Sequence, residues 1–264
     1  MDEIKLFLKE YHNELLQSST SDEIVHPKIV GNYKLDRNDA KNQIIDWVLH
    51  FLETKKCPYQ LAVVLAKNTA QQIDAGISKQ FEENENEEKF LNSITLYSET
   101  IKLLPVICNS FMENMNEKEV CSSCSLPYSA SVFAIKNKRR KMEDRHVIHH
   151  DLNFLLGLQN VPAHSYYAVF DGHSGVDAAS YASAHLHVNM AKHPAFLTDT
   201  ETAIAEAYKI TDEHFLKKCS EEVIMMICNE SESGNEPKDH LLESLYNSPH
   251  SDNFRIRPFN LNIL

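Results

Sequence analysis

The sequence predicts an α+β protein, in which a helical N-terminal region comes before a smaller region that mixes strands and helices. Three observations predict this class. Apolar residues recur at helical spacing through the first part of the chain, residues 1–120. The composition then changes, and two runs rich in β-branched and aromatic residues follow at 128–136 and 165–170. With 264 residues, 42% of them hydrophobic, the chain can bury a sizeable core.

Three stretches within 1–120 have apolar residues spaced along one face of a helix. Pro58 separates the first stretch from the second, and the charged run 82–89 predicts a solvated loop before the third. Pro105 is expected to interrupt the third helix, because proline lacks the amide hydrogen that a helix interior uses. The apolar positions are Ile44, Ile45, Val48, Phe51 and Leu52, then Leu61, Val64, Leu65, Ile73 and Ile77, and finally Phe90, Ile94, Tyr97, Ile101 and Leu104.

A linker is expected between the helical region and the second region. Residues 121–127 are small and polar and include a proline, which is typical of a linker. Cys121 and Cys124 form a CxxC pattern at its start. Because no second pair of ligands follows, free thiols are the favoured interpretation, with a metal or redox site as the alternative. The second region is expected to cover 128–218 and to open with the strand 128–136.

Two helices are expected later in the second region. The first covers 176–193, and Thr198 with Glu201 forms a capping-box pattern before the second. From 219 to 264 an apolar patch is mixed with Ser, Asn and Glu without a clear period, which predicts a poorly ordered tail. The second helix is expected to place Ile204, Ala207, Tyr208, Thr211 and Phe215 on one face.

The charge of the chain limits its partners. Its net charge is −12, whereas nucleic acids and anionic membrane surfaces are bound by basic patches. We therefore expect no nucleic acid and no membrane partner, and no run approaches the roughly 18 apolar residues of a membrane span. The N-terminus lacks a signal-peptide pattern and the cysteines are scattered, which predicts a cytoplasmic protein, with the nucleus as a second compartment.

The strongest chemical pattern is VFDGHSG at 169–175. An apolar strand ends there on Asp171, and a carboxylate held at a strand end suits a hard divalent cation. Gly172 has no side chain, so its carbonyl group can also approach a cation. His173 follows directly, and an imidazole can transfer protons near neutral pH.

A second pattern, RRKMEDR, lies upstream at 139–145. Glu143 and Asp144 are adjacent acids that suit a metal ion. Arg139 supplies a guanidinium group, which can grip phosphate oxygens in bidentate fashion. Either pattern alone is commonly a turn or a solvated charge run. Acids for a cation and an arginine for phosphate, in this order and beside predicted strands, indicate phosphoryl chemistry on a metal-bound water.

These patterns together resemble the type 2C, metal-dependent (PPM) protein serine/threonine phosphatases. The resemblance covers about residues 128–218 and is closer to the calmodulin-kinase phosphatase branch. It rests on AIKNKRRKMEDRHV, YYAVFDGHSGVDAASYA and AYKITDEHFLKK. It implies part of an αββα phosphatase β-sandwich after the helical N-terminal region, which itself fits that branch more loosely.

The resemblance implies a metal-binding role for four residues. Asp171 would bridge two Mg²⁺ or Mn²⁺ ions, and Gly172 would coordinate through its carbonyl group. Glu143 would ligate one metal, directly or through water, and Asp144 would sit in the outer coordination shell.

It also implies how substrate would be handled. Arg139 would bind the substrate phosphate, and His173 would protonate the leaving serine or threonine oxygen. The nucleophile would be a metal-bound hydroxide. The substrates would be phosphorylated Ser/Thr proteins, kinases among them.

The chain departs from the family pattern after Lys218. A Gly-Thr-Thr-rich strand, a Ser-Arg-x-x-Gly-Asp segment and a second Asp-Gly are not recognisable, and Asp252-Asn253 matches the closing Asp-Asn only by coincidence. One bridging aspartate and one glutamate neutralise two divalent cations poorly, so weak metal binding and impaired activity are expected. A C-terminally truncated splice form or an incomplete gene prediction would have this pattern.

Two alternatives remain open. The chain could be a non-catalytic binding or regulatory protein that acts through its N-terminal helices. It could also be a single-metal hydrolase that uses His146, His149 and His150, which stand together in HVIHH.

Overall fold

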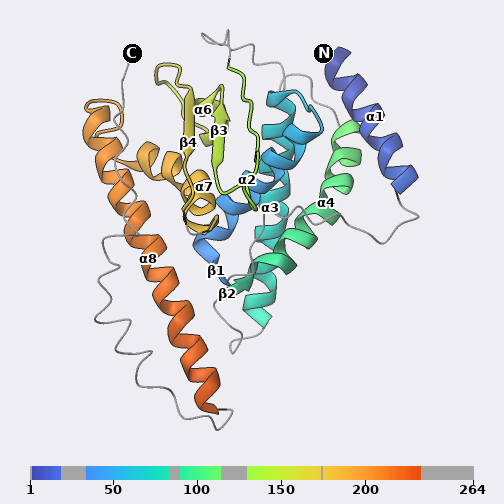
Figure 1. Ribbon diagram of the computed structural model, residues 1–264. Helices are drawn as coiled ribbons and strands as arrows, with labels where there is room; N and C mark the ends of the chain where they lie inside the picture. The colour runs from blue at the N-terminus through green and yellow to red at the C-terminus, as the bar shows by residue number, and fades with distance from the viewer. Residues whose placement is uncertain (1, 19–33, 84–89, 114–129, 174, 233–264) are drawn as a thin grey trace. The chain divides into compact units, whose positions relative to one another are not determined.

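The computed structural model describes residues 2–18, 34–83, 90–113, 130–173 and 175–232 (Figure 1). The chain divides into two compact units, residues 1–185 and 186–264. None of the helices in the described ranges is long and apolar enough to cross a membrane.

The first unit begins with four helices and a short antiparallel pair of strands (Figure 1). Helix α2 packs along α3, and α4 packs against α1, α2 and α3. The three predicted helical stretches are confirmed as α2, α3 and α4, except that Phe90, predicted on the third helix, lies in strand β2 because it pairs with β1. The elements are α1 (Asp2–Ser18), β1 (Lys34–Asp36), α2 (Arg37–Thr54), α3 (Tyr59–Glu83), β2 (Phe90–Asn92) and α4 (Ser93–Glu113).

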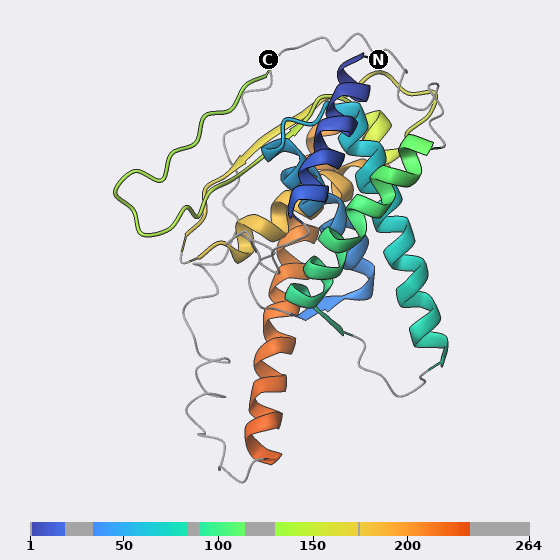
Figure 2. The ribbon, with the colours of Figure 1, turned by 90° about the vertical axis from the view of Figure 1, so that its right-hand side faces the viewer.

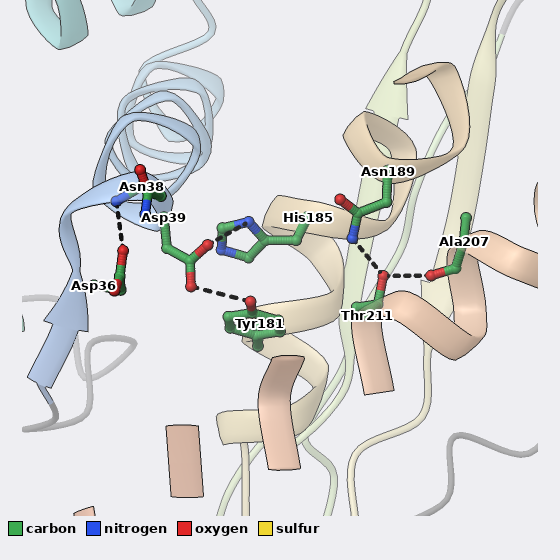
Figure 3. Close-up of polar contacts among 8 residues, drawn as sticks. All are labelled: Asp36, Asn38, Asp39, Tyr181, His185, Asn189, Ala207 and Thr211. Atoms are coloured by element: carbon green, nitrogen blue, oxygen red, sulfur yellow. Dashed lines mark hydrogen bonds and ion pairs between the residues drawn. The ribbon is translucent and has the colours of Figure 1, made fainter. Parts of the chain in front are cut away.

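A continuous apolar core holds these helices together. Trp47 of α2 meets Tyr97 of α4 edge to face, with 5.4 Å between the ring centroids. At the start of α2 the Asp36 carboxylate accepts a hydrogen bond from the backbone N–H of Asn38, at 2.7 Å, and so caps the helix (Figure 3). The largest fully buried apolar side chains of this core are Leu35, Ile44, Leu52, Leu61, Leu65 and Leu104.

The expected interruption at Pro105 was wrong, because α4 continues through it to Glu113. Proline at this position removes one helical hydrogen bond, at a cost of about 3 kcal/mol. Leu104, Cys108 and Phe111, which flank it, are all buried in the core. Each buried apolar side chain contributes roughly 1.5–3 kcal/mol, so their combined burial exceeds the cost of the proline.

An antiparallel hairpin follows in the first unit (Figure 1). Its strands are β3 (Arg145–His149) and β4 (Tyr166–Phe170), and the short helix α6 (Leu152–Leu156) lies between them in the chain. The Asp151 carboxylate caps α6, and Gly157 ends it in the left-handed conformation at φ 69°. The strand predicted at 165–170 is thus confirmed as β4.

The strand predicted at 128–136 was wrong over its described part. Residues 130–136 have no regular structure, and Phe133 and Ile135 are 88% and 67% exposed. In Figure 2 this segment is part of the green loop that extends away from the helices. A strand needs a partner and a buried face, not only β-branched residues. Arg145–His149 has both, since it pairs with β4 and buries Val147.

Two longer helices complete the described chain. α7 (Asp177–Lys192) confirms the helix predicted at 176–193 and crosses from the first unit into the second. α8 (Thr200–Glu232) lies in the second unit. There, Asn189 donates to the Thr211 hydroxyl, at 2.9 Å, and Thr211 donates to the Ala207 carbonyl, at 2.7 Å (Figure 3). The buried positions of α8 are Ala203, Ala207, Thr211 and Phe215, close to the predicted face.

The start and the length of α8 both differ from the sequence prediction. Asp199, rather than Thr198, caps the helix, because its carboxylate accepts hydrogen bonds from the backbone N–H and the hydroxyl of Thr202, at 3.1 and 2.7 Å. The helix also runs to Glu232, where no regular structure was predicted beyond residue 218. The predicted linker 121–127 with its CxxC pattern, Asp252-Asn253 and the rest of the tail lie outside the described residues.

Candidate metal-binding active site

The β3–β4 register brings the two chemical motifs to one end of the hairpin. Arg145, the first residue of β3, pairs with Phe170, the last residue of β4. In an antiparallel pair, the residues before one strand and after the other lie at the same end. Glu143 and Asp144 lie directly before β3, and Asp171 directly follows β4. The pairing therefore joins motifs that are far apart in the sequence.

Gly172 is the point of closest approach between the two motifs. It is buried, and a Cβ atom built on it would lie 2.2 Å from the carbonyl oxygen of Glu143 and 2.7 Å from its carbonyl carbon. No side chain fits at that distance from a backbone, so this contact requires glycine. Asp171 and Glu143 are thus neighbours in the folded chain, as the phosphatase interpretation requires.

The side chains beside this contact are open to solvent. The Asp171 side chain is 55% exposed and the His173 side chain 77% exposed, with 3.4 Å between Asp171 Oδ1 and His173 Nδ1. The Glu143 side chain is partly exposed. A carboxylate in this setting can bind a hydrated cation without first losing a competing hydrogen bond to the protein interior.

Arg139 is not brought into contact with the other candidate residues. It lies in a turn, in which its backbone N–H donates to the Lys136 carbonyl at 3.3 Å, and its side chain is exposed. Asp144 is also exposed. Among the residues that the structure describes, nothing fixes the Arg139 guanidinium group toward Asp171.

Arg145 is a residue of the site that the sequence analysis did not single out. Its Nη1 donates to the Asp144 carbonyl at 2.9 Å and, weakly, to the Met142 carbonyl at 3.5 Å. Its Nε donates to the Ser180 hydroxyl of α7 at 3.1 Å. The only sequence signal was an arginine directly after the Glu-Asp pair, and its partners on other elements could not be read from that.

A cavity of about 380 Å³ lies beside the hairpin, lined by α2, the start of α3, β3 and residues 130–132. Glu143, Asp144, Asp171 and Gly172 do not line it, whereas His146, His149 and His150 do. On its wall, Glu53 Oε2 lies 3.8 Å from His146 Nε2 and 3.9 Å from His50 Nδ1. The nearby Glu53 carboxylate raises the pKa of His146, the same ion pair lowers the pKa of Glu53, and burial lowers the pKa of His50.

The histidine alternative is not supported, because His146, His149 and His150 line one cavity without forming a group that could hold a metal ion. Successive strand residues point to opposite faces. His149 is buried and stacks on Tyr166, with 6.1 Å between the ring centroids, whereas His150 Nδ1 lies 3.3 Å from the Tyr167 hydroxyl. More generally, the described residues contain no group of three or more His, Cys, Asp or Glu side chains arranged to hold a metal ion.

The buried thiols are also unsuited to nucleophilic chemistry. Burial raises the pKa of Cys108 to about 12 and raises the pKa of Cys57 well above its usual range. A thiol is nucleophilic as the thiolate, so both groups are unreactive near neutral pH. This agrees with a reaction that needs no covalent enzyme intermediate.

Comparison with known proteins decides the family. The family model described as protein phosphatase 2C matches residues 128–234. Residues 128–234 therefore belong to the protein phosphatase 2C family. The match includes both motifs, Arg139–Arg145 and Val169–Gly175, and the helices α7 and α8.

The curated relatives extend the similarity into the helical region. Human protein phosphatase 1E is 36% identical over 197 residues, which cover 72% of this chain and 25% of that protein. Human protein phosphatase 1F is 34% identical over 201 residues, covering 71% of this chain and 44% of that protein. The chain therefore spans less than half the length of these relatives.

One solved structure has a similar fold. It is titled as a structure of a C. elegans sex determining protein, with a TM-score of 0.54 and 16% sequence identity. The similarity covers 83% of this chain and 53% of that chain. At this identity it supports the fold alone.

The donors at the hairpin end fit a hard cation in type but not in number. Members of the family are metal-dependent. Glu143 and Asp171 offer carboxylate oxygens, and the glycine at 172 leaves the backbone close enough for a carbonyl donor, as Mg²⁺ and Mn²⁺ prefer. Two carboxylates with a carbonyl group are compatible with a largely hydrated ion rather than a closed site.

Proposed function

We propose that this chain carries part of the active site of a metal-dependent protein serine/threonine phosphatase, with phosphorylated proteins, kinases among them, as substrates. The observation that supports this most is the contact of Gly172 with the Glu143 backbone, since it places Asp171 beside the upstream acids. The match of residues 128–234 to protein phosphatase 2C supports the interpretation of these carboxylates as part of a phosphatase active site.

Four groups of the chain would bind and orient the cation. Glu143 and Asp171 would bind through carboxylate oxygens and Gly172 through its carbonyl oxygen, while Asp144 would accept hydrogen bonds from coordinated water. When bound, Mg²⁺ or Mn²⁺ supplies Lewis-acid activation of water and neutralises phosphoryl charge.

Two further groups would act on the substrate. Arg139, exposed on its turn, would close on the phosphate oxygens when substrate is present. His173, whose Nδ1 lies 3.4 Å from Asp171 Oδ1, would donate a proton to the leaving serine or threonine oxygen.

Metal affinity and turnover are proposed to be low in this chain. Asp171-Gly172 is the only Asp-Gly in the sequence, so no second motif of that kind supplies another bridging carboxylate. A Mg²⁺ or Mn²⁺ ion held by few protein ligands keeps most of its water and dissociates readily.

Phosphate release from a phosphoserine or phosphothreonine peptide tests the proposal, with Mn²⁺ varied from zero to several millimolar. We expect slow, Mn²⁺-dependent release that Asp171→Ala abolishes. Glu201→Ala, on the exposed first turn of α8, is a matched acidic control that should leave the rate unchanged. Release that is absent at every Mn²⁺ concentration, or that survives Asp171→Ala, would reject activity at this site.

A non-catalytic role for the helices is the second candidate. It is favoured by the separate, continuous core of α1–α4, which does not depend on the metal site. Affinity capture with residues 1–120 against the whole chain would test it. Enrichment of the same partner by both is expected, and no enrichment over a bead control would count against it.

A further inference from the structure

The two segments that carry the candidate ligands are each tied to the same helix, α2. The Met142–Asp144 turn leads into β3, and the loop after Asp171 leads into α7. The backbones of the two segments approach each other closely where Gly172 meets Glu143. What holds β3 and α7 in place therefore also sets the geometry between the ligands.

Arg145 is the direct link between the two segments. It reaches back to the carbonyl groups of Met142 and Asp144, on either side of Glu143, and sideways to Ser180 of α7. A guanidinium group has several donors in a fixed plane, so one side chain can hold both segments at once.

Asp46 of α2 interacts electrostatically with this arginine. Burial raises the pKa of Asp46 to about 7. Arg145 and Ser183 of α7 both act to lower the pKa of its carboxyl group.

A second tie joins α2 to α7 near the start of α2 (Figure 3). The Tyr181 hydroxyl donates to Asp39 Oδ2 at 3.0 Å, and His185 Nδ1 lies 3.9 Å from Asp39 Oδ1. The Tyr181 and His185 rings stack on each other at 4.2 Å between centroids. The helix that follows the Asp171 loop is thereby fixed to α2 at two places.

We propose that Arg145 is a positioning residue for the metal ligands, and that α2, through its contacts with α7, makes the helical region part of the metal site. This inference rests on the proposed function, since it assigns a role to groups around the same ligands. A metal ion binds more tightly when its ligands are held in place beforehand, because less ordering is needed on binding.

Mn²⁺ affinity of the whole chain, measured by water-proton relaxation, is the test. We expect Arg145→Gln to weaken Mn²⁺ binding by about tenfold, as for other partners of metal ligands. Arg145→Lys should restore only part of it, because an ammonium group cannot hold both carbonyls and Ser180. Asp46→Asn and Ser180→Ala should each weaken binding about threefold, which is a small loss for one hydrogen bond.

Tyr59→Phe is the matched control. The Tyr59 hydroxyl donates to the Asp151 carbonyl at 3.4 Å, so it also ties the helical region to the hairpin segment, but beside α6. Its loss should leave Mn²⁺ affinity unchanged. An equal effect of Tyr59→Phe and Arg145→Gln would overturn the proposal, because it would indicate general loosening.

Asp171→Ala separates this proposal from the proposed function. If Asp171→Ala abolishes Mn²⁺ binding while Arg145→Gln leaves it unchanged, the positioning role fails and the metal site stands. If Asp171→Ala has no effect, the metal site itself fails. Should Arg145→Gln not fold by circular dichroism, Ser180→Ala decides in its place, and unchanged affinity there would overturn the positioning role.

Discussion

The helical region and the β3–β4 hairpin differ in how they use their apolar residues. The helices α1–α4 bury theirs in one core, with Leu61 and Leu104 fully inaccessible. The hairpin buries Val147 and Phe170 but leaves Val169 64% exposed. The candidate ligands all lie on the hairpin side, at one end of its strands. The comparison indicates that the helices provide most of the stability, and that the hairpin carries the chemistry and depends on its anchors.

The largest effect should come from a cavity in the helical core. Leu104→Ala is expected to lower the free energy of unfolding by about 2–5 kcal/mol, because a fully buried side chain leaves a void. Val169→Ala, on the exposed face of β4, should cost less than about 0.5 kcal/mol. Urea denaturation followed by the fluorescence of Trp47, the only tryptophan, measures both. Equal losses would contradict the assignment of stability to the helices.

Gly172→Ala should have the next largest effect, and on the hairpin. The new Cβ would overlap the Glu143 carbonyl group, so the end of the hairpin must move, at a cost of about 1–3 kcal/mol together with loss of Mn²⁺ binding. Gly76→Ala in α3 is the control, since nothing lies within 4 Å of its Cβ position. That variant should be more stable by about 0.4–1 kcal/mol. Unchanged Mn²⁺ binding in Gly172→Ala would contradict the close contact.

The smallest predicted effect is a pair of opposite pH dependences where α2 meets β3. The Glu53 carboxylate raises the pKa of His146 from its ordinary 6.5. The His146–Glu53 ion pair therefore stabilises the fold fully below that pH, and this stabilisation is lost as the pH rises through the folded pKa of His146. Burial lowers the pKa of His50, so His50 destabilises the fold as pH falls below 6.5. The pKa of Glu53 is lowered from its ordinary 4.5, so Glu53 stays charged through the range in which the two histidines titrate.

Replacing each histidine separates the two effects. His146→Gln should lower the free energy of unfolding, relative to the unchanged chain, by about 0.2–1 kcal/mol more at pH 6 than at pH 8. This is the size of the contribution of a solvent-accessible ion pair. His50→Gln should show the reverse trend. Denaturation at the two pH values is the measurement, and the same sign for both variants would show that the two histidines do not differ as described.

The same contrast explains what the sequence could predict. The helices α2, α3 and α4 follow from local periodicity, and α4 passes Pro105 only because its neighbours are buried by other helices. Strand β3 was missed because HVIHH becomes a strand only by pairing with β4, across α6.

For the site, the motif residues could be predicted but their support could not. The sequence motifs were enough to predict chemical roles for Asp171, Gly172 and Glu143, and the structure brings these residues together. The role of Arg145 depends on Ser180 and on Asp46, which lie on two other elements. A local sequence pattern cannot predict which residues of distant elements lie close to Arg145. Arg139 has the residue type expected for phosphate binding, yet its turn leaves it exposed.

Broadening of backbone amide signals by Mn²⁺, recorded by NMR on the whole chain, tests most directly whether the two motifs share one cation. The account predicts that the amides of residues 142–144 and 171–173 broaden together at the same Mn²⁺ concentration, and that Asp171→Ala removes both effects. Broadening confined to one of the two motifs, or broadening of both that persists in Asp171→Ala, would contradict it.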